Sequence, residues 1–174
     1  MTDRYLVLVR HAKAEHPDGV ADIDRPLTPR GHGDAAAAGA WLAHRRLAPD
    51  LVLCSPAKRT RQTWHGIALG MAESAAAGGN GAVGGGMDVR YDPVAYAGDA
   101  QDLLERLRAV DEETRMVLLV GHNPAISLLS AALDPATEPD GLRTCGIAVH
   151  RPTGTWRESG SGTAVLEAVH TARG

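Results

Sequence analysis

The sequence predicts an α/β fold, in which helices cover both faces of a mostly parallel or mixed sheet, and three observations lead to this prediction. Residues 5–9 and 115–120 are apolar runs of the length expected for strands buried on both faces. Residues 28–47, 55–71 and 99–110 instead place their apolar side chains at helical spacing. The two kinds of segment alternate along the chain, which is typical of a three-layer α/β/α sandwich.

Local signals bound the individual elements. Thr28 is a good N-cap, and Pro29 suits the first position of the helix that follows it. Residues 50–54 form another apolar strand, after which Ser55 is the expected cap of a second helix, and Asp99 is the expected cap of a third. Further strands are predicted at 87–91, 146–150 and 163–169, and a further helix at 124–133.

Length and composition favour one globular domain spanning residues 1–174. The 174 residues are 44% hydrophobic, which is enough to build a substantial core. Residues 75–86 are a Gly/Ala tract without apolar periodicity, and we interpret them as a flexible surface insertion.

Charge and cysteine content exclude several classes of protein. A net charge of -3 gives no basic field for nucleic acid. Cys54 and Cys145 lie in apolar surroundings and are expected to be buried, reduced thiols. The N-terminus shows no signal peptide, and no apolar run of about 18 residues suggests a membrane span. We therefore expect a soluble, cytoplasmic protein without a membrane or nucleic-acid partner, and a monomer.

Polar side chains of one kind follow three of the predicted strands. The carboxyl ends of parallel strands share one edge of a sheet, so these groups are expected to converge where open α/β folds place ligands. Guanidinium groups match phosphate oxygens, and imidazole can attack phosphorus or donate a hydrogen bond. The predicted site therefore binds a dianion. Its side chains are Arg10 and His11, Ser55 and Arg59, and His122 and Asn123.

These segments resemble the histidine phosphatase superfamily, which has the phosphoglycerate-mutase-like fold. The resemblance covers most of the chain, and the Arg-His-Ala-Lys and Gly-His-Asn-Pro segments look most like the SixA branch of phosphohistidine phosphatases. The matching segments are Val9–Ala12, Leu27–Gly31, Ser55–Pro56 with Arg59, Gln62–Thr63, and Gly121–Pro124.

The resemblance implies a role for each matching residue. His11 would be the nucleophile that forms a phosphohistidine intermediate, and Arg10 and Arg59 would hold the phosphoryl oxygens. His122 would stabilise the charge that develops in the transition state. No metal and no organic cofactor is implied. Ser55, Asn123 and Lys13 are additional candidates for substrate binding, although Lys13 is equally compatible with a plain surface position.

The substrate depends on whether the chain supplies an acid to protonate the leaving group. Asp92, Asp99 and Asp102 are weak candidates, because the last two are expected to start a helix. A missing acid fits a SixA-like enzyme that acts on protein phosphohistidine, for example on a phosphotransfer domain. A small-metabolite phosphomonoesterase or mutase remains an alternative, and so does an inactive phosphate-binding module.

The remaining polar residues are given plainer interpretations. Residues 13–26 are read as a polar loop, and Arg61 is expected to point away from Arg59 into solvent. A metal site made by His11, His16 and Asp18 is disfavoured, because the chain lacks paired metal-ligand motifs. Surface or packing roles are expected for His16, His32, His44, His65, His150 and His170.

Overall fold

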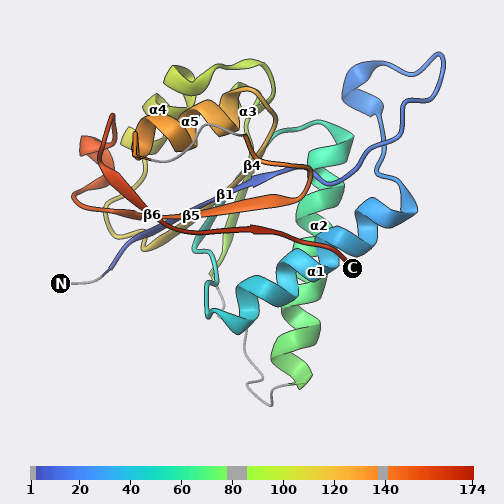
Figure 1. Ribbon diagram of the computed structural model, residues 1–174, viewed down its shortest axis with the longest axis horizontal. Coiled ribbons are helices and arrows are strands. Elements are labelled where there is room, and N and C mark those ends of the chain that lie inside the picture. Colours follow the sequence, from blue (N-terminus) through green and yellow to red (C-terminus); the bar gives the residue numbers. More distant parts are fainter. Residues whose placement is uncertain (1–2, 78–85, 137–140) are drawn as a thin grey trace.

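The computed structural model describes residues 3–77, 86–136 and 141–174, and it has the predicted α/β architecture (Figure 1). A six-stranded sheet has the order β3-β2-β4-β1-β5-β6. β1, β2, β3 and β4 are parallel, whereas β5 runs antiparallel to both β1 and β6. The strands are β1 (Tyr5–Arg10), β2 (Leu51–Cys54), β3 (Asp88–Tyr91), β4 (Met116–Gly121), β5 (Gly146–Pro152) and β6 (Ala164–Thr171).

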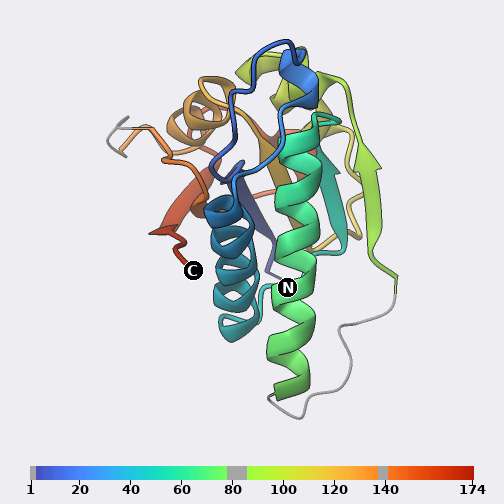
Figure 2. The same cartoon turned by 90° about the vertical axis from the view of Figure 1, so that its right-hand side faces the viewer.

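Helices cover both faces of this sheet (Figures 1 and 2). α1 (Pro29–His44) and α2 (Lys58–Ala77) lie on one face, and α4 (Ala100–Arg108) and α5 (Ala125–Leu133) lie on the other. Alternate residues of a strand point to opposite faces. Val7 and Val9 of β1 therefore join the core under α1 and α2, while Leu6 and Leu8 join the core under α4 and α5.

The helices α1 and α2 approach each other closely, because glycines line their contact. A Cβ atom at Gly39 would lie 2.0 Å from the carbonyl oxygen of Ile67, and one at Gly70 would lie 2.0 Å from that of Ala36. This packing fixes the start of α2 beside the carboxyl end of β1. Thr63 then accepts a hydrogen bond from the Ala12 N–H at 3.0 Å, and Gln62 accepts one from the Leu27 N–H at 2.8 Å.

Most predicted boundaries agree with the structure. Thr28 caps α1 by accepting the Gly31 N–H, and Asp99 and Asp102 form a reciprocal capping box at the start of α4. The prediction that Ser55 caps α2 is wrong, because that helix begins at Lys58 and the Ser55 hydroxyl accepts the Ala57 N–H, which precedes the helix.

Two other sequence interpretations need correction. The predicted insertion at 75–86 overlaps the last residues of α2, Ala75–Ala77, and residues 78–85 lie outside the described part of the chain. Helix α1 ends at His44 rather than at Leu47. The sequence interpretation also did not include three short helices: η1 (Asp22–Asp24), α3 (Val94–Ala97) and η2 (Trp156–Glu158).

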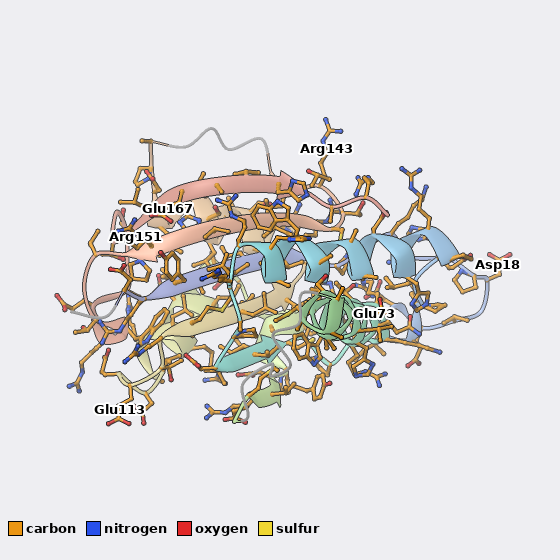
Figure 3. All side chains as sticks on the ribbon, turned by 90° about the horizontal axis from the view of Figure 1, so that it is seen from below. Asp18, Glu73, Glu113, Arg143, Arg151 and Glu167 are labelled. Atoms are coloured by element: carbon orange, nitrogen blue, oxygen red, sulfur yellow. The ribbon has the colours of Figure 1, made fainter. Side chains whose placement is uncertain are left out.

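The charged side chains that Figure 3 labels lie on the outside of the molecule. Arg151 of β5 and Glu167 of β6, for example, pair across neighbouring strands. Cys54 and Cys145 are buried free thiols, as the sequence predicted. No helix among the described residues is both long and apolar enough to cross a membrane.

Candidate active site

The site is assembled where three parallel strands end side by side. Arg10 at the end of β1 pairs with Gly121 at the end of β4, and Cys54 of β2 pairs with Val120. Backbone bonds extend this register by one residue, because the His11 N–H donates to Gly121 at 3.0 Å and the Ser55 N–H donates to Val120 at 3.1 Å. The polar residues that follow the three strands are therefore brought together.

His11 is held in one tautomer. Its Nδ1 lies 2.7 Å from the carbonyl oxygen of Ala12. A carbonyl only accepts hydrogen bonds, so Nδ1 carries the proton and the lone pair is on Nε2. Burial lowers the pKa of His11 to about 4, and the nearby cations Arg59 and Arg10 act in the same direction. The ring is consequently neutral at physiological pH, which is the state that a nucleophilic nitrogen requires.

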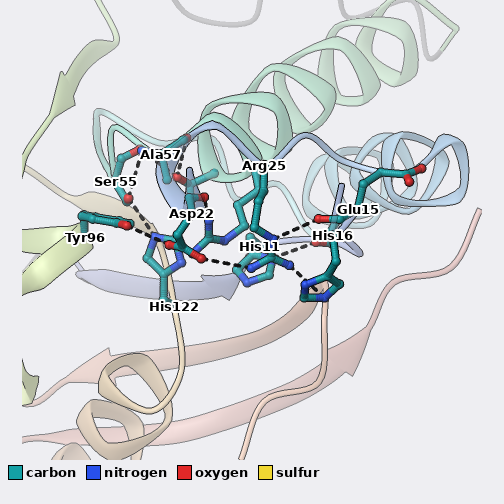
Figure 4. A network of polar contacts seen from close by, with 12 residues as sticks. His11, Glu15, His16, Asp22, Arg25, Ser55, Ala57, Tyr96 and His122 are labelled. Carbon is teal, nitrogen blue, oxygen red and sulfur yellow. Dashed lines mark hydrogen bonds and ion pairs between the residues drawn. The ribbon is translucent and has the colours of Figure 1, made fainter. Parts of the chain in front are cut away.

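His122 lies beside His11, with ring centroids 5.4 Å apart. Its Nε2 is 2.8 Å from the Ser55 hydroxyl (Figure 4). The Tyr96 ring packs against the imidazole in a T-shaped arrangement, with ring centroids 5.5 Å apart. Burial lowers the pKa of His122 to about 3, and Arg59 contributes to this shift. His122 is therefore neutral in the ligand-free protein.

Arg10 is anchored by the segment that precedes β5. Its Nη1 donates to the carbonyl of Leu142 at 3.1 Å, and the Asn123 amide donates to the same carbonyl at 2.8 Å. Ser127 supports the arrangement, because its hydroxyl bonds to the Asn123 side chain and accepts the Leu142 N–H. Asn123 thus lines the site and also positions the residues around Arg10.

Arg59 is oriented by a residue that the sequence interpretation missed. Asp22 of η1 accepts two hydrogen bonds from its guanidinium group, through the main-chain oxygen at 2.7 Å and the carboxylate at 3.1 Å. The Tyr96 hydroxyl donates to the same carboxylate at 2.7 Å. Hydrogen bonds from Tyr96, and then from Arg25 and Arg59, hold the pKa of Asp22 well below its usual range. The carboxylate therefore stays ionised.

The polar loop at 13–26 contributes two further residues to the pocket. It passes near the N-terminal end of α2 (Figure 2), and Arg25 donates to the Glu15 carbonyl at 2.9 Å and to His16 Nε2 at 3.0 Å (Figure 4). His16 was expected to be a surface or packing residue, but it lines the pocket together with Arg25. The only sequence signal for this loop was the group of charged residues directly after the nucleophile candidate.

A pocket of roughly 570 Å³ joins these residues. Arg10, His11, Lys13, Arg59 and His122 all line it, as does Asn123. Ser55 does not line the pocket, since it is fully buried behind His122. Arg61 is also absent from the lining. Its Nε donates to the Pro56 carbonyl at 2.9 Å, and the side chain is half-buried rather than solvated.

Three buried side-chain nitrogens in this site have no protein partner. Among the residues that the structure describes, the buried side-chain nitrogens without a hydrogen-bond partner are Arg10 Nε, Arg59 Nε and His122 Nδ1. Buried polar groups are nearly always paired, because leaving one unpaired costs about 1–3 kcal/mol. Their concentration here indicates a site that is completed by a ligand with several acceptor oxygens.

The candidate acids lie elsewhere. Asp92 pairs with Arg106 at 2.6 Å and accepts the Val94 N–H, and Asp99 and Asp102 are used in their capping box. Within the described part of the chain, Asp34 is the carboxylate that lines the pocket. No group of three histidine, cysteine or carboxylate side chains suited to a metal ion occurs among the described residues.

Comparison with known proteins agrees with this geometry. Residues 6–76 match the pattern of the histidine phosphatase superfamily, branch 1. A protein of Mycobacterium tuberculosis with no assigned function is 35% identical over 176 residues, which cover 95% of this chain and all of the relative. The fold and the pair of histidines define an α/β protein of the phosphoglycerate-mutase-like class.

Solved structures extend the comparison. A candidate SixA phosphohistidine phosphatase from Nakamurella multipartitia is 33% identical, covers 99% of this chain and 98% of its own, and has a TM-score of 0.82. A mycobacterial glucosyl-3-phosphoglycerate phosphatase, 21% identical with a TM-score of 0.62 over 98% of this chain and 99% of its own, shares the fold. This chain belongs to the histidine phosphatase superfamily and is of the SixA type.

Proposed function

We propose that this protein is a phosphohistidine phosphatase that hydrolyses phosphorylated histidine on a protein, with His11 as the nucleophile. The observation that carries the proposal is the convergence of a neutral imidazole with three unpaired buried nitrogens, two of them guanidinium donors, in one pocket. Phosphoryl transfer depends mainly on positioning and on neutralisation of charge, and these groups supply both.

The reaction has two steps. The lone pair on His11 Nε2 attacks phosphorus, the P–N bond of the substrate breaks, and the leaving imidazole takes a proton from solvent. A water molecule then attacks the phosphoryl group on His11, which releases inorganic phosphate and a proton and restores the free ring. Arg10, Arg59 and His122 would hold the phosphoryl oxygens in both steps, because their unpaired side-chain nitrogens lie within the same site.

The surroundings of the leaving group favour a P–N substrate over an alkyl ester. An alkoxide needs a proton donor, and the Asp22 carboxylate beside Arg59 has a depressed pKa that makes it a poor one. None of Asp92, Asp99 and Asp102 lines the pocket. Imidazole departs from a labile P–N bond with less assistance, so the missing acid is less costly for phosphohistidine.

A comparison of substrates tests this proposal. Turnover of a phosphohistidine peptide would be measured beside an aryl phosphate and a series of alkyl phosphates. Acid catalysis contributes about 10²–10⁴-fold where it operates, so alkyl esters should be slower by a gap of that order. The single changes Asp92→Asn, Asp99→Asn and Asp102→Asn should leave phosphohistidine turnover nearly unchanged.

The metabolite-phosphatase alternative predicts the opposite pattern. If alkyl phosphates are cleaved as fast as phosphohistidine, and an Asp→Asn change at one of those three positions or at Asp34 removes that activity, the proposal fails. Binding of phosphate without turnover of any substrate would instead favour the inactive phosphate-binding module.

A further inference from the structure

The pocket continues beyond the two histidines toward the first turn of α1 and the segment that follows β6. Arg30, Thr144 and Arg173 line this part, and Lys13 follows closely after His11 in the chain. The volume of roughly 570 Å³ falls within the range of about 300–1,000 Å³ that is usual for small-molecule sites. A single phosphoryl group therefore leaves much of the pocket free.

The wall of this extension is tied to the site by hydrogen bonds. The Cys145 N–H donates to the carbonyl of His11 at 3.0 Å, which places Thr144 next to the nucleophile candidate. Arg173 donates to the Thr144 carbonyl at 3.0 Å and lies 3.6 Å from the Asp34 carboxylate. The Asp34 carboxylate is also 4.0 Å from Arg30.

The charges in the extension are unbalanced. Asp34 is the single carboxylate among its described lining residues, it is only 3% exposed, and it also accepts the Gly174 N–H at 2.9 Å. Three cations line the pocket with it, of which Arg30 and Arg173 lie within 4.0 Å of its carboxylate and Lys13 is the third. The Arg30 side chain is 66% exposed, with a contact to Asp34 at the outer limit of an ion pair, so it is free to bind another anion.

We propose that Lys13, Arg30 and Arg173 form an anion subsite that binds a second negatively charged group on the substrate. The inference rests on the proposed function, since it assumes that the phosphoryl group lies at His11. The second group is a carboxylate or a phosphate on the same molecule. It can come from an acidic side chain next to the phosphohistidine of a protein, or from a small phosphate ester that carries a carboxylate.

A binding experiment tests the subsite without requiring turnover. Methylphosphonate would be compared with ω-carboxyalkylphosphonates of increasing chain length, with each Kd measured by isothermal titration calorimetry. We expect at least one carboxylated ligand to bind about tenfold or more tightly than methylphosphonate, because charge-assisted hydrogen bonds are stronger than neutral ones. Arg30→Gln and Arg173→Gln should each reduce this gain severalfold.

Arg143→Gln is the matched control, because it removes the same charge from a residue next to Thr144. Arg143 is exposed, does not line the pocket, and points away from the molecule in Figure 3. The Arg143→Gln variant should keep the full gain in affinity for the carboxylated ligand over methylphosphonate. Equal affinities for methylphosphonate and every carboxylated ligand would overturn the subsite while leaving the phosphoryl site intact, and so would a gain that survives both Arg30→Gln and Arg173→Gln.

Peptide substrates distinguish the two sources of the second anion. Phosphohistidine peptides with Asp or Glu on either side would be compared with peptides that have Asn or Gln there. A higher kcat/KM for one acidic peptide, lost in Arg30→Gln, identifies an acidic protein segment. A gain confined to the small carboxylated ligands identifies a metabolite. In that case the subsite stands, and the protein-substrate part of the proposed function fails.

Discussion

His11 lies among cations that attract an anion, and its own ring must nevertheless stay uncharged to act as the nucleophile. Burial and the positive charges of Arg59 and Arg10 lower the pKa of its ring, while the Ala12 carbonyl selects which nitrogen keeps the proton. A charged imidazolium would make a poor nucleophile. The cationic surroundings therefore bind the phosphoryl group and also keep the nucleophile neutral.

This depressed pKa predicts how stability varies with pH. The folded value of about 4 lies below the reference value of about 6.5, so the unfolded chain binds more protons between these pH values. The stabilisation is complete above pH 6.5 and is lost as the pH falls toward 4. Between pH 7 and pH 5, the free energy of unfolding of the wild-type protein should fall by about 2 kcal/mol more than that of His11→Gln. Urea denaturation in phosphate-free buffer measures both values.

His32→Gln is the control for this measurement, because it removes an exposed histidine, which lies in α1. An identical loss of stability in the wild-type protein and in His11→Gln would mean that His11 titrates normally in the folded state. Burial would then not be what keeps the His11 ring neutral.

At the scale of elements, the contact between α1 and α2 determines where Arg59 and Thr63 lie. Gly39→Ala should destabilise the protein by about 1–3 kcal/mol or more, because its new methyl group would meet the Ile67 carbonyl. Gly33→Ala lies in the same helix with no atom within 4 Å of its new methyl group, and should stabilise by about 0.5–1 kcal/mol. Chemical denaturation of both variants measures the difference.

A second readout connects this packing to the site. Because α2 carries Arg59, Gly39→Ala should also weaken phosphate binding, whereas Gly33→Ala should not. Equal stabilities for the two alanine variants would contradict the close approach of the two helices.

The elements themselves could largely be predicted from the sequence. Apolar runs identify the central strands, and the Thr28 and Asp99 caps define two helix starts within a residue. Helix α3 was missed because it is only four residues long, too short for its periodicity to be recognised. Ser55 was wrongly predicted to be a helix cap. In the sequence, a serine before a helix looks the same whether its hydroxyl bonds to the helix or to a histidine.

At the scale of the whole molecule, only some residues of the candidate site could be predicted from the sequence. Arg10 ends β1, His11 and His122 directly follow strands, and the topology of a parallel sheet brings such residues together. Asp22 and Arg25 were missed, because the path of an irregular loop depends on tertiary hydrogen bonds rather than on local pattern. The anion subsite depends on contacts between segments far apart in the chain.

Identifying the nitrogen that becomes phosphorylated shows directly whether His11 is the nucleophile. The protein would be reacted rapidly with a labelled phosphohistidine peptide, quenched in alkali, and analysed by mass spectrometry and phosphorus NMR. Because Nδ1 of His11 donates to the Ala12 carbonyl, we expect an acid-labile phosphoryl group on His11 Nε2. The label should be absent from His11→Ala, which should fold but show no turnover. Full turnover by His11→Ala, or a label on another residue, would contradict it.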